Sequence, residues 1–377
     1  MLPVAGAAAK FPMLQSDRVA GKPSGKPAAG PPKLEYRTIG KTGLKVTTVG
    51  MGCMITSDPT VIARAADLGI TYFDTARGYQ HGNNERMVGA ALGAKRKQVV
   101  LSTKSHSFDK PSLLKDLDTS LSELKTDYVD IWYLHSRDNP KDITDEMIEV
   151  QQLAKQQGKI RFAGMSTHAL PKMAEWTVTK RAFDVVLTVC NFSIDKPLED
   201  AMAAVAATGT GVVGMKVMAG GAHGFGPSNP VRDRLGREGA MLAALKWVLH
   251  RPFISTTIPS MTDMDQLDEN VRAMAQPFSA ADDKILTAHL ETIRPLYCSM
   301  CGECDGACAK GLPVADMLRI LTYADGYGQF ALARERFLEL PSRVAAVRCG
   351  DCAECTVACP HGVKVQARLS RAQELLA

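Results

Sequence analysis

The chain has 377 residues, a length that fits two domains or one large barrel with an appendage. Apolar residues make up 45% and charged residues 23% of the sequence, an ordinary globular balance that excludes a mostly disordered chain. The net charge is +5, but residues 1–33 hold five basic residues against one acidic residue. The remainder is therefore close to neutral, and no nucleic-acid partner is expected. No apolar run reaches the roughly 18 residues of a membrane span, so no integral membrane segment is expected.

Residues 1–33 are rich in Ala, Gly, Pro and Lys, as in GKPSGKPAAGPP, and predict a flexible arm. A second interpretation remains open. The run MLPVAGAAA ends in small residues like the tail of a secretory signal, although a basic segment before it is missing. The region is therefore predicted to be a flexible N-terminal arm or a signal remnant.

From residue 36 to about residue 276, short β-rich runs alternate with amphipathic helical stretches such as 112–125 and 144–158. The predicted strands are 47–52, 70–74, 99–104, 128–135, 160–166, 184–190, 211–217 and 254–259. Eight strands that alternate with helices favour an α/β fold, a (β/α)8 TIM barrel. A doubly wound open sheet is the alternative, but the first strand runs into GMGCMITSD and not into a G-x-G-x-x-G loop.

Polar side chains follow three neighbouring strands of the predicted barrel. Asp74, Lys104 and His135 stand at the ends of the second, third and fourth strands, and Tyr79 lies five residues beyond Asp74. Reactive residues of such barrels come from the C-terminal ends of several strands, so these four side chains are expected to meet at one mouth. The structural alternative is a buried Asp–Lys pair with a packing Tyr.

The barrel region resembles the aldo-keto reductase family over about residues 35–276. The resemblance is carried by YRTIGKTGLKVTTVGMG, GITYFDTARGYQHGNNERMVG, STK and DIWYLH. It implies a catalytic tetrad of Asp74, Tyr79, Lys104 and His135 that reduces a carbonyl. Tyr79 would donate the proton, Lys104 would lower the pKa of Tyr79, Asp74 would hold Lys104, and His135 would orient the carbonyl oxygen.

The family's nicotinamide site is only partly kept. Leu187 and Met215 replace a carboxamide-binding Gln and a stacking Tyr, and Ser260 and Gln266 stand where basic side chains would grip a 2′-phosphate, with Asp263 close by. NAD(P)(H) is expected, but no preference for NADP. Three alternatives stay open: the chain binds NAD(H), it binds the 2′-phosphate through another residue such as Lys216, or it no longer uses a free nicotinamide. The expected cofactor contacts are Ser166, Asn191, Lys216, Glu269 and Asn270.

Eight of the ten cysteines form two copies of one spacing near the C-terminus. CSMCGECDGAC (298–308) and CGDCAECTVACP (349–360) both read C-x2-C-x2-C-x3-C. The spacing indicates metal binding, and the tail resembles the two-cluster 4Fe–4S ferredoxins, in which the fourth Cys of each run serves the other cluster. Zinc is the alternative. The resemblance implies one cluster on Cys298, Cys301, Cys304 and Cys359, and a second on Cys349, Cys352, Cys355 and Cys308.

The residues between the two motifs (309–348) carry helical periodicity, which suggests a small, mostly helical ferredoxin-like domain. A helix at about 280–294 would join it to the barrel. The predicted division is 1–33 for the arm or signal remnant, 34–278 for the barrel, and 279–377 for the linker helix and dicluster domain.

Three hypotheses for function follow. The first is an oxidoreductase acting on a small-molecule carbonyl or alcohol, with the clusters serving electron transfer or the docking of a redox partner protein. The second is an iron–sulfur electron-transfer or redox-sensing protein with a degenerate barrel, and the third is a non-redox acid/base enzyme.

The expected location is cytoplasmic, or periplasmic by export of the folded protein if residues 1–10 are a trimmed signal. His106, His168 and His223 are candidates to face the pocket, and Cys53 and Cys190 are expected to be small buried hydrophobes.

Overall fold

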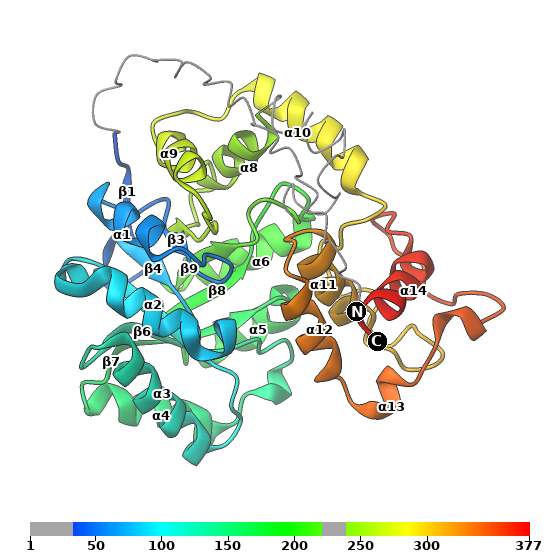
Figure 1. Ribbon diagram of the computed structural model, residues 1–377, viewed down its shortest axis with the longest axis horizontal. Coiled ribbons are helices and arrows are strands. Elements are labelled where there is room, and N and C mark those ends of the chain that lie inside the picture. Colours follow the sequence, from blue (N-terminus) through cyan, green and yellow to red (C-terminus); the bar gives the residue numbers. More distant parts are fainter. Residues whose placement is uncertain (1–32, 221–238) are drawn as a thin grey trace, which may run out of the picture. The chain divides into compact units, whose positions relative to one another are not determined.

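A computed structural model describes residues 33–220 and 239–377, and eight parallel strands form its central sheet in the order β10-β9-β8-β7-β6-β5-β4-β3 (Figure 1). The strands are β3 (Met51–Gly52), β4 (Tyr72–Asp74), β5 (Val100–Ser105), β6 (Val129–Leu134), β7 (Ile160–Thr167), β8 (Val185–Val189), β9 (Gly211–Met215) and β10 (Thr256–Thr257). Parallel bridges from Val49 to Thr257 and from Gly52 to Ser260 close the sheet on itself. The predicted (β/α)8 barrel is confirmed, with each of its eight strands at the expected place.

The closure of the barrel depends on a close approach of two backbones. A Cβ atom on Gly52 would lie 2.4 Å from the carbonyl oxygen of Ile258, a distance that no side chain can accept. The Gly52 amide donates instead to the carbonyl of Pro259 at 3.0 Å, and the Gly50 amide donates to that of Thr257 at 2.8 Å. Glycine is thus required where the first and last strands of the barrel meet.

Helices pack around the sheet, and most begin at a side-chain cap. They are α1 (Pro59–Asp67), α2 (Asn83–Leu92), α3 (Lys110–Leu124), α4 (Asp145–Gln156), α5 (Leu170–Lys180), α6 (Lys196–Ala207), α8 (Ala240–Leu249) and α9 (Met264–Ala273). Asp58, Asp109, Thr144, Asp195 and Asp263 each accept a hydrogen bond from a backbone amide of the first turn that follows. Such caps satisfy amides that have no partner within the helix, and therefore fix where each helix begins.

An antiparallel hairpin seals the end of the barrel at which the strands begin. Its strands are β1 (Tyr36–Thr38) and β2 (Lys45–Thr47). Ile39 and Val46 are fully buried in one cluster with the interior residues Tyr72 and Tyr133. The Lys41 amide donates to the carbonyl of Gly209, just before β9 begins. With that end closed by apolar side chains, the cavity of the protein lies at the other end, where the strands finish.

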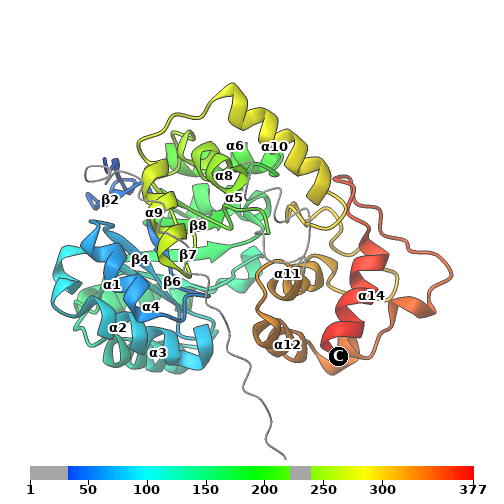
Figure 2. The same cartoon turned by 45° about the horizontal axis from the view of Figure 1, so that its top comes forward.

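The C-terminal region is helical, as predicted. It comprises α10 (Ala280–Ile293), α11 (Val314–Asp325), α12 (Phe330–Leu338), α13 (Ser342–Ala345) and α14 (Val365–Leu376). Met317 and Leu321 of α11, Phe337 of α12 and Leu369 of α14 share one buried cluster, which extends to Val189 at the end of β8. Figure 2 shows α11 and α12 beside the ends toward which the barrel strands point.

α10 connects the two regions and is attached to the barrel by a buried ion pair. Lys246 of α8 contacts Asp282 of α10 at 2.6 Å, and Asp282 also completes a capping box with Ser279. None of the helices in the described ranges is long and apolar enough to cross a membrane.

Candidate active site

The four side chains expected at the barrel mouth do meet there. Asp74 ends β4, Lys104 lies in β5, His135 follows β6, and Tyr79 begins a short 3-10 turn, η1 (Tyr79–Gly82). Lys104 forms a salt bridge with Asp74, and its Nζ lies 3.4 Å from the hydroxyl oxygen of Tyr79. The rings of Tyr79 and His135 meet edge to face with centroids 5.8 Å apart. Parallel pairing of β4, β5 and β6 places these positions at one edge of the sheet.

The Lys104–Asp74 pair is buried and fully hydrogen-bonded. Both residues are about 1% exposed. Lys104 Nζ also donates to the carbonyl of Thr75 at 2.7 Å, and Asp74 accepts from the Ser102 hydroxyl at 2.7 Å. Burial raises the pKa of Asp74 and lowers the pKa of Lys104, while each charge opposes the shift of the other. Neither partner can be removed without leaving an uncompensated charge in the interior.

The pKa of Tyr79 differs from the sequence-based expectation. Burial raises this pKa well above its usual value, the Asp74 carboxylate and Tyr323 raise it further, and Arg336 lowers it. The expected net lowering is not found: Lys104 does not outweigh burial and the Asp74 carboxylate, because Asp74 lies against Lys104 and offsets its charge. Tyr79 is therefore a protonated phenol in this site, the form that can donate a proton.

The tetrad's His135 and two further imidazoles beside it, His106 and His168, are all held neutral. His106 stacks on His135 with ring centroids 3.8 Å apart, and the Nδ1 atom of His168 lies 3.3 Å from Asp138. Burial and nearby cations lower the pKa of His135 well below its usual value and that of His106 to about 3. Burial and Arg319 lower the pKa of His168 to about 4. His223, the other predicted pocket histidine, lies outside the described residues.

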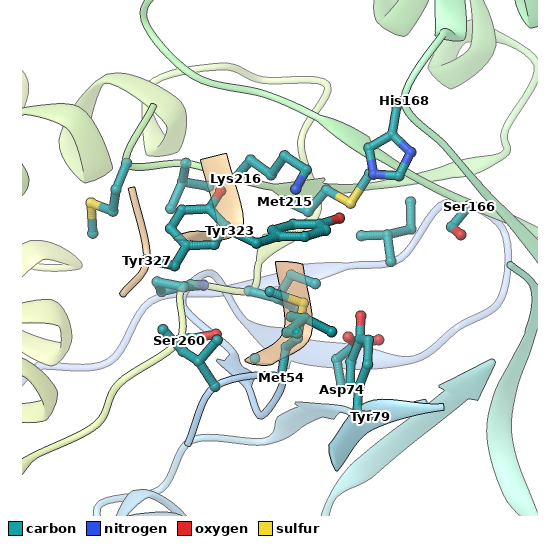
Figure 3. A pocket seen from close by; sticks show the side chains of 18 of the residues that line it. Met54, Asp74, Tyr79, Ser166, His168, Met215, Lys216, Ser260, Tyr323 and Tyr327 are labelled. Atoms are coloured by element: carbon teal, nitrogen blue, oxygen red, sulfur yellow. The ribbon is translucent and has the colours of Figure 1, made fainter. Parts of the chain in front are cut away.

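A cavity of about 380 Å³ opens above the tetrad (Figure 3). Of the predicted cofactor contacts, Ser166, Lys216, Glu269 and Asn270 line it together with Asp74, Tyr79, Lys104 and His135. Asn191 does not line it. Asn191 is fully buried beside the cavity, where its amide donates to the carbonyl of Lys216 at 3.1 Å and to the hydroxyl of Tyr297 at 3.2 Å.

Other positions singled out in the sequence divide between the cavity and the core. Leu187, Met215, Ser260 and Gln266 line the cavity. Cys53 and Cys190 are fully buried in the hydrophobic core and are not among its lining residues.

The segment between β10 and α9 offers polar groups that already bind one another. Asp263 accepts from the Gln266 backbone amide at 2.9 Å and from its side-chain amide at 2.6 Å. Thr262 also bonds to the Gln266 side chain, with its amide donating at 3.1 Å. A phosphate placed here would face a carboxylate and amides that are already engaged.

Helices of the C-terminal region complete the cavity, which the sequence reasoning missed. Arg319 and Tyr323 come from α11, Tyr327 follows α11, and Leu332 and Arg336 come from α12. Arg319 and Tyr323 are four residues apart and therefore share one face of α11, and Tyr327 continues the same spacing just beyond the helix end. This spacing of one Arg and two Tyr was the signal available in the sequence.

Tyr323 is surrounded by cations. The Lys216 Nζ lies 4.9 Å from the centroid of its ring, and Arg319 Nη1 donates to its hydroxyl at 3.4 Å. Burial alone would raise the pKa of Tyr323, but Lys216, Arg319 and Arg336 outweigh it and lower the pKa to about 8.

The eight clustered cysteines fall into two groups of four in space, and all are free thiols. The pKa of Cys298 is raised to about 12, mainly by burial and also by the nearby Cys304, Cys301 and Cys359. Burial also raises the pKa of Cys349, with Cys308, Cys352 and Cys355 adding to the effect. A small separate cavity is lined by all four thiols of this second group, Cys308, Cys349, Cys352 and Cys355. Each group thus takes three cysteines from one motif and the fourth from the other.

Hydrogen bonds hold the two cysteine motifs side by side. The Thr356 hydroxyl donates to the carbonyl of Ala307 at 2.8 Å and accepts from the amide of Ala309 at 3.2 Å. The first motif also contacts the barrel, because Asp305 forms a salt bridge with Lys172. Ligand atoms of Asp195, Cys301 and His361 lie within 4.8 Å of one another at this contact.

Comparison with known proteins agrees with this fold. Residues 57–224 match the model of the Aldo/keto reductase family. The chain is 28% identical to L-galactose dehydrogenase of Arabidopsis thaliana, over 69% of this chain and 94% of that one. It is 26% identical to the uncharacterized oxidoreductase YqkF of Bacillus subtilis, over 68% and 96%. The holo form of the aldo-keto reductase AKR11C1 from Bacillus halodurans superposes with a TM-score of 0.58 at 25% identity, covering 68% of this chain and 96% of that structure.

The chain therefore carries an aldo/keto reductase family domain on a (β/α)8 barrel. The prediction of an oxidoreductase enzyme of the aldo-keto reductase type is confirmed.

Tyr323 should ionise near pH 8. Its pKa is lowered from 10.0 to about 8, so its phenol loses its proton as the pH rises through that value. Ultraviolet difference titration should show one tyrosinate forming in this step, and Tyr323→Phe should remove it. Tyr327→Phe is the matched control, since burial raises the pKa of Tyr327 to about 12 and its loss should leave the step unchanged. A titration in which no tyrosine ionises at a lower pH than the remaining tyrosines of the chain would contradict the account.

Proposed function

We propose that the protein interconverts a carbonyl and an alcohol with Tyr79 as the general acid/base, assisted by Lys104, Asp74 and His135. The observation that carries the proposal is the cavity itself. It joins the Tyr79 hydroxyl, 3.4 Å from Lys104 Nζ, to Ser166, Glu269 and Asn270 in one continuous space. A proton donor and a set of nucleotide-binding positions thus share one enclosure.

The proton path runs through Tyr79. In reduction, its hydroxyl donates a proton to the carbonyl oxygen as charge develops there. Neutral His135 lies edge to face with Tyr79 and offers a ring nitrogen to the same oxygen. Its Nδ1 has no hydrogen-bond partner among the described residues. Lys104 stabilises the phenolate that remains, and Asp74 keeps Lys104 in place.

The site favours reduction at neutral pH. Burial and Asp74 hold the pKa of Tyr79 well above its usual value, so the protonated acid is always available. The reverse direction requires Tyr79 to act as a base. Alcohol oxidation should therefore become faster as the pH rises, while reduction should change little until the phenol titrates.

The residues present fit a nicotinamide nucleotide without selecting its 2′-phosphate. Ser166, Lys216, Glu269 and Asn270 face the cavity and would hold the cofactor, which when bound exchanges a hydride with the carbonyl carbon. Ser260 and Gln266 can offer only neutral hydrogen bonds, and Asp263 would repel a phosphate. The chain should thus use NAD(H) at least as well as NADP(H).

The two groups of cysteines fit two 4Fe–4S clusters with crossed ligation. The first would be held by Cys298, Cys301, Cys304 and Cys359, and the second by Cys349, Cys352, Cys355 and Cys308. Support comes from the second group, whose four thiols line one small cavity without forming a disulfide. Such clusters exchange single electrons.

The positions of the two groups suggest how they would be used. Cys298 is buried in the cluster that includes Val189 of the barrel, whereas Cys355 is exposed. We place the barrel at 34–278 and the dicluster domain at 279–377. A redox partner protein would then approach the second group, on the exposed side.

Replacing Tyr79 by Phe should lower carbonyl reduction by about 10²- to 10⁴-fold, the usual contribution of a positioned general acid. The substitution removes one hydroxyl that faces a cavity, so the unfolding temperature and nucleotide affinity should be unchanged. Tyr327→Phe is the matched control, because it removes another cavity hydroxyl without touching Lys104. The rates to compare are initial velocities on an aldehyde, measured anaerobically with NADH. Equal rates for wild type and Tyr79→Phe would exclude Tyr79 as the acid.

The purified protein should hold about eight irons and as many acid-labile sulfides per chain. Cys308→Ala should remove the same electron paramagnetic resonance signal as Cys352→Ala, because both belong to the second group. Cys304→Ala should remove the other signal, and Cys190→Ala, a buried thiol outside both groups, should leave both intact. If Cys308→Ala and Cys304→Ala abolished the same signal, ligation would not be crossed. Zinc without sulfide would exclude the clusters.

A further inference from the structure

Three cations from outside the tetrad face the cavity: Lys216, Arg319 and Arg336. We propose that Arg319 and Arg336 of the C-terminal helices, with Lys216, form an anion-binding subsite that holds a carboxylate of the substrate beside Tyr79. The substrate class is then a carbonyl compound, or its alcohol, that carries a carboxylate. This inference rests on the proposed function and names the substrate class of the same site.

One guanidinium nitrogen of Arg336, Nη2, lies near Gly78 and is available to a ligand. Its Nη1 binds both oxygens of Glu339, at 2.9 and 2.8 Å. Its Nη2 donates to no acceptor within residues 33–220 and 239–377, and lies 3.3 Å from where a Cβ on Gly78 would stand. Gly78 immediately precedes Tyr79. Arg336 is also close enough to Tyr79 for its charge to lower the pKa of that phenol. A carboxylate on this nitrogen would therefore lie near the proton donor.

Arg319 and Lys216 complete the subsite from neighbouring positions. Arg319 Nη2 binds Asp316 at 2.6 Å, and its Nη1 reaches the Tyr323 hydroxyl with a long contact of 3.4 Å. Lys216 lies over the rings of Tyr323 and Tyr327, 4.9 and 5.5 Å from their centroids. It forms no salt bridge with any carboxylate in the described part of the chain. Both arginines are thus positioned by one acidic partner while a second edge faces the cavity.

The pKa values of the groups around the subsite are lowered, as a positive electrostatic potential would lower them. Lys216, Arg319 and Arg336 together overcome burial and lower the pKa of Tyr323 to about 8. Burial and then Arg336 lower the pKa of His106, and burial and then Arg319 lower that of His168. Asp138 and Asp316 oppose this field only partly. A carboxylate would be stabilised where the Tyr323 phenolate is.

The chemistry favours a carboxylate over a phosphate dianion. The planar fork of a guanidinium matches a carboxylate in two hydrogen bonds. Asp316 offsets the charge of Arg319, and Glu339 offsets that of Arg336. The positive charge that remains in the subsite is that of Lys216, so a ligand with one negative charge balances it better than a ligand with two. The arginines also face the loops after β4 to β7, where Gly78, His106 and His168 lie. Glu269 and Asn270, two of the expected nucleotide positions, lie in α9 after β10 instead. Lys216 is also an expected cofactor contact, so the assignment of the subsite to the substrate rests on the two arginines.

A matched pair of aldehydes tests the subsite. 4-Formylbenzoate and its methyl ester present the same carbonyl and differ in one negative charge. Wild-type protein should prefer the carboxylate by roughly ten- to hundred-fold in kcat/KM, as expected for a charged hydrogen bond. Arg336→Met should abolish that preference, so that kcat/KM on the carboxylate falls to its value on the ester within the same variant, and Arg336→Lys should retain part of the preference. Arg334→Met, an exposed arginine two residues away on the same helix, should behave as wild type.

A second readout separates failure of the subsite from failure of the proposed function. Benzoate bound beside Tyr323 should raise the pKa of that phenol above its unliganded value near 8, and methyl benzoate should not. This shift is visible in the ultraviolet titration even if no aldehyde is turned over. Equal use of both aldehydes, or a Tyr323 titration indifferent to benzoate, would overturn the proposal. A preference for 4-formylphenyl phosphate over 4-formylbenzoate would overturn the assignment of a carboxylate.

Discussion

The buried ion pair between Lys104 and Asp74 is the constraint on which the site depends. Two charges can persist at about 1% exposure only because each compensates the other, and because Ser102 and Thr75 satisfy their remaining hydrogen bonds. The pairing of β4 with β5 sets their separation, since Asp74 lies opposite Ser102 and Lys104 follows two residues later on the same edge. Burial, together with the Asp74 charge, also keeps Tyr79 protonated. With its charge offset by Asp74, Lys104 leaves the phenol protonated, so the site is arranged to give a proton.

The C-terminal helices supply the other half of the electrostatics. The barrel alone would present a tetrad whose charges cancel, two further neutral imidazoles (His106 and His168) and Lys216. α11 and α12 add Arg319, Tyr323 and Arg336 to this surface and turn a neutral mouth into a positive one. The same region carries the two groups of thiols, and one hydrophobic cluster joins Cys298, Tyr323 and Val189. The part of the chain proposed to hold the redox centres is therefore also the part that closes the active site, and changes in one would be felt by the other.

Sequence reasoning recovered what depends on local pattern and chain order. The eight strands were predicted from short β-rich runs. The meeting of the tetrad was predicted from polar residues at strand ends, because parallel strands all end at the same mouth of the barrel. The two groups of cysteines follow from the repeated spacing. The part of the cavity wall made by α11 and α12 did not follow from the sequence. The approach of Arg336 to Gly78 joins residues 258 positions apart and is set by the packing of apolar faces. The pKa of Tyr79 was missed for a related reason: burial and the Asp74 charge outweigh the lysine, and neither magnitude can be read from order alone. The Asn191 side chain binds Tyr297 and the Lys216 carbonyl and is not among the residues that line the cavity, so its contact with a cofactor stays a prediction.

The central claim is that this cavity is a nicotinamide-dependent active site with no grip on a 2′-phosphate. The most direct measurement is a pair of dissociation constants for NADH and NADPH, taken on the full chain without oxygen at one ionic strength. The account predicts that both bind and that NADPH gains nothing over NADH, because Ser260 and Gln266 offer only neutral bonds and Asp263 opposes the phosphate. Absence of binding by either nucleotide would contradict the claim. A ten-fold or greater preference for NADPH would show that a basic side chain reaches the phosphate from elsewhere in the chain.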